Sequence, residues 1–144
     1  MGDRGNIRVI QTKNVEKNGK WTTKPGASIW LYTHRTGSDV AQVAHRALAK
    51  RWRWNDDTYL TRIVYDELAK GNYGTETSFG IGTELGDNEH VIVELDVAKQ
   101  EVRFVDHLAT KPKILETFTF EKFAGMTELA VATAFDVCDR RHAA

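Results

Sequence analysis

Residues 90–107, HVIVELDVAKQEVRFVDH, constrain the fold of this chain more than any other segment. Two runs rich in valine flank the polar residues 98–100, a pattern typical of two antiparallel strands joined by a short turn. The turn predicts a register in which residue 91 faces residue 107, to within about two residues. The segment therefore predicts a hairpin with a histidine at each outer end, and the outer ends of a hairpin meet.

The other strand signals lie on either side of this hairpin. Strands are expected at residues 7–11 and 27–34, joined by a long polar hairpin loop over residues 12–25. Residues 77–83 predict a strand loosened by glycine, and residues 115–120 predict a short edge strand. Because both faces of the strand at 27–34 carry bulky side chains, we expect it to lie inside the sheet rather than at its edge.

Helix signals cluster in the same way. A helix capped by Ser38 or Asp39 is expected to follow the second strand. Its apolar stripe, at the spacing of one helix face, consists of Val40, Val43, Ala44, Ala47 and Leu48. A second helix follows the cap signal at residues 55–57 and ends at Gly71, and a third covers residues 126–140. Strands and helices that cluster separately predict an α+β fold: one domain over residues 1–144, with an antiparallel sheet of about five strands covered by two consecutive helices and a C-terminal helix.

Composition narrows the class of protein. The 41% hydrophobic and 10% aromatic content is typical of a globular chain. Basic and acidic residues number 20 each, and this balance argues against nucleic acid as a partner, although it leaves room for a local basic patch. A single cysteine, a polar N-terminus and the lack of an apolar run of about 18 residues predict a cytoplasmic protein without a membrane segment.

The hairpin histidines form the first candidate site. His90 and His107 are expected to lie within about 8 Å of each other. With Asp106 they would form a catalytic acid–base group, and with Glu89 they would bind a divalent metal such as zinc. The alternative is two solvated histidines at strand ends, hydrogen-bonded to nearby acids, in which case no cofactor is required.

A second candidate site lies where a strand runs into a helix. Arg35 and Ser38 flank a glycine and bring donors to the helix start, where backbone N–H groups attract anions. This loop is therefore a candidate for binding a phosphate or a carboxylate. The alternative is ordinary capping of the helix.

Cations and aromatic rings alternate in the run Arg51, Trp52, Arg53 and Trp54. Tryptophan and arginine contribute most of the energy of many protein interfaces, so the run is a candidate contact surface for another protein or a ligand. The alternative is that the tryptophans anchor the joint between two helices. Two tryptophans two positions apart in a connection are difficult to bury together.

Five short segments of the sequence occur together: residues 5–7, 31–34, 53–60, 80–82 and 87–90. In combination they resemble a group of small uncharacterised proteins of bacteria and bacteriophages. The resemblance implies a bacterial, phage or prophage origin and carries no activity with it. It favours a small protein that acts by binding a protein or a ligand.

Two functions remain from the sequence. The first is a binding or interaction protein that uses residues 51–54, and the second is a small metal- or histidine-dependent hydrolase at the open end of the 90–107 hairpin. An exposed strand edge would also allow two copies of the chain to pair as a two-fold dimer.

Overall fold

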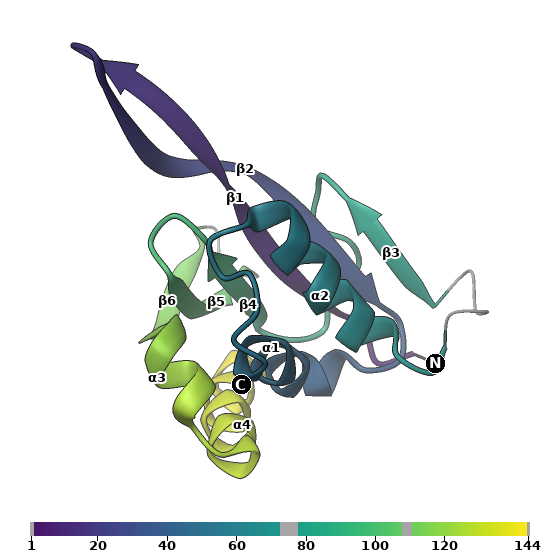
Figure 1. Ribbon diagram of the computed structural model, residues 1–144. Helices are drawn as coiled ribbons and strands as arrows, with labels where there is room; N and C mark the ends of the chain where they lie inside the picture. The colour runs from purple at the N-terminus through teal and green to yellow at the C-terminus, as the bar shows by residue number, and fades with distance from the viewer. Residues whose placement is uncertain (1, 73–77, 108–110, 144) are drawn as a thin grey trace.

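The computed structural model describes residues 2–72, 78–107 and 111–143, with side chains described up to residue 140. These residues form a six-stranded sheet and four α-helices (Figure 1). The strands are β1 (Gly5–Lys17), β2 (Lys20–Thr33), β3 (Phe79–Gly82), β4 (Ile92–Asp96), β5 (Glu101–Asp106) and β6 (Lys113–Thr119). The helices are the 3-10 turn η1 (Gly37–Asp39), α1 (Val40–Ala49), α2 (Asp57–Ala69), α3 (Phe120–Gly125) and α4 (Glu128–Ala143). The predicted α+β class is confirmed.

The sheet is mixed, and the prediction of an antiparallel sheet is wrong on this point. The strand order is β3-β2-β1-β4-β5-β6, and β4 lies parallel to β1. The physical reason is the connection from β3 to β4, which starts beside β2 and must cross both β2 and β1 before β4 can pair. Hairpin signals report only on strands that follow one another, so they do not reveal this pairing.

The predicted hairpin of residues 90–107 is confirmed. Strand β4 pairs with β5 from Ile92 opposite Val105 to Asp96 opposite Glu101. The same spacing puts residue 91 opposite 106, one residue from the predicted register. The last residue of the turn, Gln100, has a φ of 55°.

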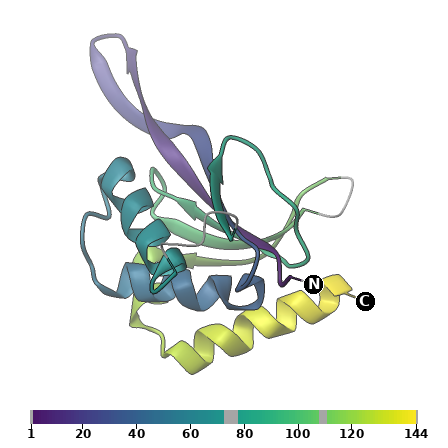
Figure 2. The same cartoon turned by 90° about the vertical axis from the view of Figure 1, so that its right-hand side faces the viewer.

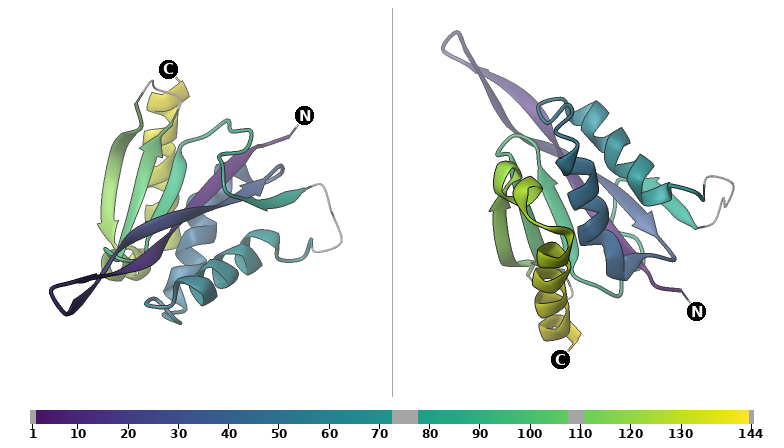
Figure 3. Two further views of the ribbon diagram at one scale, coloured as in Figure 1. Left: turned by 90° about the horizontal axis from the view of Figure 1, so that it is seen from above. Right: turned by 60° about the horizontal axis from the view of Figure 1, so that its bottom comes forward.

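Residues 12–25 form a long two-stranded ribbon, here called the arm, and the predicted loop is wrong. The ladder between β1 and β2 continues from Thr12 opposite Pro25 to Lys17 opposite Lys20. Asn18 and Gly19 turn the chain with φ of 53° and 77°, the left-handed values of the tight hairpin turn that an Asn-Gly pair favours. The arm projects well beyond the rest of the molecule (Figures 1 and 3).

The helices cover one face of the sheet (Figure 2). Alternation along β4 places Val93 and Leu95 in the core beneath the helices, whereas Glu94 and Asp96 point to the opposite face. The predicted apolar stripe of α1 is confirmed, since all five of its residues are buried. Helix α2 begins after the predicted cap, where the Asp56 carboxylate accepts a hydrogen bond from the Tyr59 N–H at 3.2 Å.

The sequence predicts the C-terminal helix at residues 126–140; α4 begins two residues later, at Glu128, and ends at Ala143. Thr127 caps α4 by accepting a hydrogen bond from the Ala130 N–H at 3.1 Å. The short helix α3 between β6 and α4 had no counterpart in the prediction. Within the described residues, no helix combines the length and the apolar character needed to cross a bilayer.

Candidate functional site

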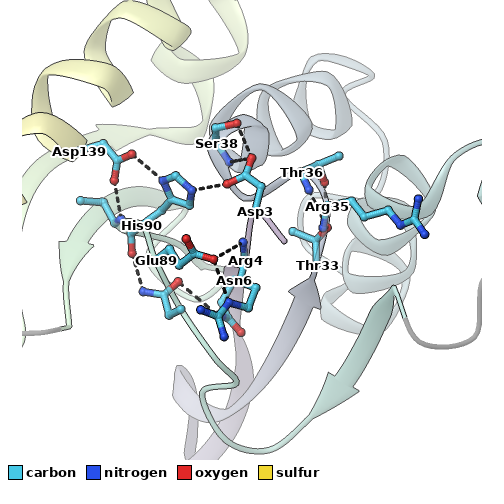
Figure 4. A network of polar contacts seen from close by, with 12 residues as sticks. Asp3, Arg4, Asn6, Thr33, Arg35, Thr36, Ser38, Glu89, His90 and Asp139 are labelled. Carbon is cyan, nitrogen blue, oxygen red and sulfur yellow. Dashed lines mark hydrogen bonds and ion pairs between the residues drawn. The ribbon is translucent and has the colours of Figure 1, made fainter. Parts of the chain in front are cut away.

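The ring of His90 is held at both of its nitrogens, in a cluster here called the His90 cluster (Asp3, Ser38, His90 and Asp139) (Figure 4). Nδ1 contacts the Asp139 carboxylate of α4 at 2.7 Å, and Nε2 contacts the Asp3 carboxylate near the N-terminus. The second oxygen of Asp139 accepts the Val91 N–H at 2.8 Å. One imidazole thus links the N-terminal segment, the start of β4 and the last helix.

Asp3 extends the His90 cluster to the start of α1. Its Oδ2 accepts hydrogen bonds from the Ser38 hydroxyl at 2.6 Å and the Ser38 N–H at 3.0 Å. The predicted anion-binding loop therefore already holds an anion, and that anion is the chain's own carboxylate. Arg35 points away from it and donates from Nε to the Ser78 hydroxyl at 2.9 Å (Figure 4).

Charge stabilises the His90 cluster. Partial burial alone would lower the pKa of His90, but hydrogen bonds to Asp139 and Asp3 outweigh it and raise this pKa. Burial likewise favours a higher pKa for Asp3, but the hydrogen bonds from Ser38 and His90 lower it overall. In its imidazolium form the ring can donate to both carboxylates, and only 16% of the His90 side chain is exposed.

The contacts of the His90 cluster hold segments of the chain together and do not form a catalytic arrangement. In nucleophilic catalysis a hydroxyl must donate to the imidazole that activates it. Here the Ser38 hydroxyl donates to Asp3, and Asp3 lies between the hydroxyl and the ring. With both ring nitrogens engaged by carboxylates, His90 has no nitrogen left to accept a proton from a substrate.

The structure separates the two hairpin histidines. His107 lies on the face of the sheet opposite the helices, where its ring meets the edge of Trp30 with centroids 5.5 Å apart and its Nε2 is 3.6 Å from Glu94. His90 turns toward the helices because residues 89 and 90 form a bend, which breaks the alternation of the strand. The expected pair of adjacent imidazoles is therefore not formed.

The other two predicted members of this site are Glu89 and Asp106. Glu89 accepts from Arg4 Nε at 2.8 Å, and Asp106 ends β5. Across residues 2–72, 78–107 and 111–140, no three His, Cys, Asp or Glu side chains are grouped so as to hold a metal. Asp3 and Asp139, which do contact His90, were missed because they lie 87 and 49 residues away in sequence.

A buried ionic network on the open face of the sheet was also missed. Arg103 donates to Glu94 at 3.2 Å, to Asp96 at 2.9 Å and to Glu101 at 3.0 Å. Arg8 donates to the second oxygen of Glu94 at 2.7 Å. The sequence contains a pattern that indicates this network. Acidic residues alternate with Val93 and Leu95 along one strand, and a basic residue lies opposite them in the partner strand. The network joins β1, β4 and β5 and fixes their register.

The run at residues 51–54 divides into an anchored half and an exposed half. Trp54 is anchored: its Nε1 donates to the Leu48 carbonyl at 3.1 Å, and its ring meets the edge of Phe120. Arg51 binds both carboxylate oxygens of Glu121, at 2.7 and 2.8 Å. Trp52 instead faces solvent, with 59% of its surface exposed.

Trp52 and Tyr59 border a depression of about 310 Å³ beside α2, here called the aromatic hollow. Its lining residues are Trp52, Arg53, Tyr59, Arg62, Ile63 and Asp66. The Arg53 guanidinium lies 4.7 Å from the centre of the Tyr59 ring, so the cation and the ring support each other. Arg51 and Arg53 both have left-handed φ, 58° and 57°, which is uncommon for residues with a side chain. Such conformations concentrate at functional sites.

A second hollow lies next to the His90 cluster. It has a volume of about 270 Å³ and is lined by Gly2, Arg4, His34 and Glu89. Its polar groups are already paired, Arg4 with Glu89 and the His34 ring with the Tyr32 hydroxyl at 3.0 Å. Paired groups of this kind offer a ligand less than the aromatic hollow does.

Comparison with models of protein families, with curated proteins and with solved structures finds no match to this chain.

Proposed function

We propose that this protein is a binding module whose aromatic hollow receives a segment of another protein. The proposal rests on one observation: Trp52 is 59% exposed, Tyr59 is 47% exposed, and both line one concave surface. Large aromatic groups in a depression are the usual anchors of protein interfaces, since covering them removes much apolar area from water. The bacterial or phage origin suggested by the sequence is part of this proposal.

The lining of the aromatic hollow suggests the chemistry of the partner. Trp52, Tyr59 and Ile63 offer apolar contact, so the partner should insert an apolar side chain. Arg53 and Arg62 supply two guanidinium groups against the one carboxylate of Asp66. The partner segment should therefore carry aspartate or glutamate next to its apolar anchor, because such a pair complements the local charge.

The hydrolase alternative receives no such support. Its two histidines lie on opposite faces of the sheet, and the groups around His90 are bonded to one another. The binding module is therefore the function that the geometry supports best.

Selection from a displayed peptide library tests the proposal even though the natural partner is unidentified. Peptides selected on the purified protein should combine an aromatic or large aliphatic residue with adjacent acids. Titration of such a peptide should give an affinity that falls at least 10-fold with Trp52→Ala and with Arg62→Glu, since central aromatic and arginine residues commonly contribute about 2 kcal/mol or more. Leu129→Ala is the matched control, because Leu129 is 77% exposed on α4, away from the aromatic hollow.

Two results would contradict the proposal. One is a set of selected peptides that bind the Trp52→Ala variant as tightly as the parent protein. The other is equal weakening by Leu129→Ala, which would show that the peptides bind the depression along α4 that Leu129 lines, or exposed apolar groups in general.

A further inference from the structure

The arm sorts its charges by face. Side chains of residues paired across two strands point to the same face of a ribbon. One face of the arm carries the pairs Lys13 with Lys24 and Lys17 with Lys20, separated by the pair Val15 with Thr22. The other face carries the pairs Thr12 with Pro25, Asn14 with Thr23 and Glu16 with Trp21, and so has no basic residue.

This arrangement is unfavourable for the isolated protein. Like charges placed directly opposite each other across two strands are destabilising, and the arm contains two such pairs. All four lysines are exposed, and within the described part of the chain none of them forms an ion pair. The two pairs lie about 14 Å apart, four residues along each strand. Four positive charges thus line one side of a ribbon that extends into solvent.

We propose that the lysine face of the arm binds the phosphate backbone of duplex DNA. The major groove of B-form DNA is wide enough for a two-stranded ribbon, whereas that of A-form RNA is too narrow and deep to be read by side chains. Two lysine pairs provide up to four phosphate contacts. The ladder fixes the spacing of the four lysines along the backbone, and their flexible side chains can each reach a phosphate.

The neutral net charge of the whole chain does not oppose this proposal. The Debye length at 0.1 M salt is about 10 Å, and charges on the body of the protein are largely screened from the tip of a projecting arm. A phosphate backbone near the tip therefore experiences the local excess of lysines. The expectation that nucleic acid is not a partner was based on the balance of acidic and basic residues over the whole chain. This average hides the local excess of lysines on the arm.

An anionic membrane or an acidic protein fits the arm less well. Attraction of lysines to anionic lipids contributes only about 1 kcal/mol per lysine, and amphipathic segments that bind a membrane interface add an apolar face next to the cations. The lysine face contains only Val15 as an apolar group, and Trp21 is on the other face, opposite Glu16. Protein interfaces likewise depend on buried apolar anchors at their centre, and this face provides none of comparable size.

The test is fluorescence anisotropy of a labelled DNA duplex of about 20 base pairs, titrated with the full chain between 50 and 200 mM salt. Four phosphate contacts predict a slope of log K against log salt near −3.6, equivalent to about a 150-fold loss of affinity over this range. A variant with Lys13, Lys17, Lys20 and Lys24 changed to glutamine should lose this slope. Changing only Lys17 and Lys20 should halve it.

The matched control changes four exposed lysines of the body to glutamine, namely Lys70, Lys99, Lys113 and Lys122. It removes the same total charge and should keep the slope. Trp52→Ala should also keep it, so this proposal can fail or succeed independently of the proposed protein contact. Circular dichroism checks that each variant is folded.

Four outcomes would overturn the proposal. They are the absence of salt-dependent binding, equal loss in the control variant, tighter binding to phosphatidylserine vesicles than to DNA, and equal or tighter binding to an RNA duplex. The last two would assign the arm to an anionic membrane or to the phosphate backbone in general.

Discussion

Replacing His90 with glutamine should destabilise the protein in a way that depends on pH. The substitution removes an imidazolium that donates hydrogen bonds to the carboxylates of Asp3 and Asp139. Hydrogen bonds to charged groups contribute about 1.5–3 kcal/mol each. Because Asp3 is 35% exposed and solvent screens its contact, we expect a total loss of about 2 kcal/mol at pH 5.5.

The sign of the pH dependence follows from the two pKa shifts. The pKa of His90 is raised in the folded state, so its contribution is complete below the ordinary value of 6.5 and is lost as pH rises through the higher folded value. The pKa of Asp3 is lowered, so its contribution is complete above 3.8 and is lost as pH falls through the lower folded value. The His90 cluster therefore stabilises the folded protein most between pH 3.8 and pH 6.5, the ordinary pKa values of the two groups.

Urea denaturation of the parent protein and the His90→Gln variant at pH 5.5, 7 and 8.5 measures this effect. Between the unfolded and folded pKa of one histidine, stability changes by at most about 1.4 kcal/mol per pH unit. The difference between the two proteins should thus shrink toward pH 8.5. His34→Gln is the matched control, because His34 is exposed and should give a small difference at every pH. A His90→Gln difference that stays constant, or grows with pH, would refute the imidazolium between two carboxylates.

Two further predictions concern stability. Trp52→Ala should change the free energy of unfolding by less than about 0.5 kcal/mol, whereas Trp54→Ala should lower it by about 3 kcal/mol because Trp54 packs on Phe120. Urea denaturation measures both values, and equal losses in the two variants would contradict the division into an exposed and an anchored tryptophan. Arg103→Met should cost about 3–5 kcal/mol at pH 7, because it leaves the buried Asp96 carboxylate without its cation and removes one of the two guanidinium groups that pair with Glu94. A thermal midpoint that is insensitive to this substitution at pH 7 would disprove the role given to the network.

Local patterns in the sequence were sufficient for most of the elements. The stripe of α1, the cap of α2 at Asp56 and the 90–107 hairpin depend on residues within a few positions of one another, and all three are confirmed. The arm was missed although Asn18-Gly19 is a strong hairpin signal. Its flanking residues are polar on both faces, so the alternation that marks a half-buried strand is absent.

Contacts between distant segments were beyond local patterns. The parallel pairing of β1 with β4 depends on the path of the chain after β3, which no local motif encodes. The direction of the His90 ring depends on the bend at residues 89–90 and on acids from both ends of the chain. In contrast, the division of Trp52 and Trp54 into exposed and anchored residues agrees with the expectation that both could not be buried together.

The four tryptophans provide the most direct test of the proposed protein contact. They report on separate regions: Trp21 on the arm, Trp30 on the open face of the sheet, Trp52 at the aromatic hollow and Trp54 at the joint between α1 and α2. The measurement is the indole N–H spectrum of the ¹⁵N-labelled protein during titration with a selected peptide. A large shift of the Trp52 signal, with those of Trp21 and Trp30 unchanged, is the predicted result. An unchanged Trp52 signal together with a shift at Trp21 or Trp30 would contradict the proposal that partners bind at the aromatic hollow.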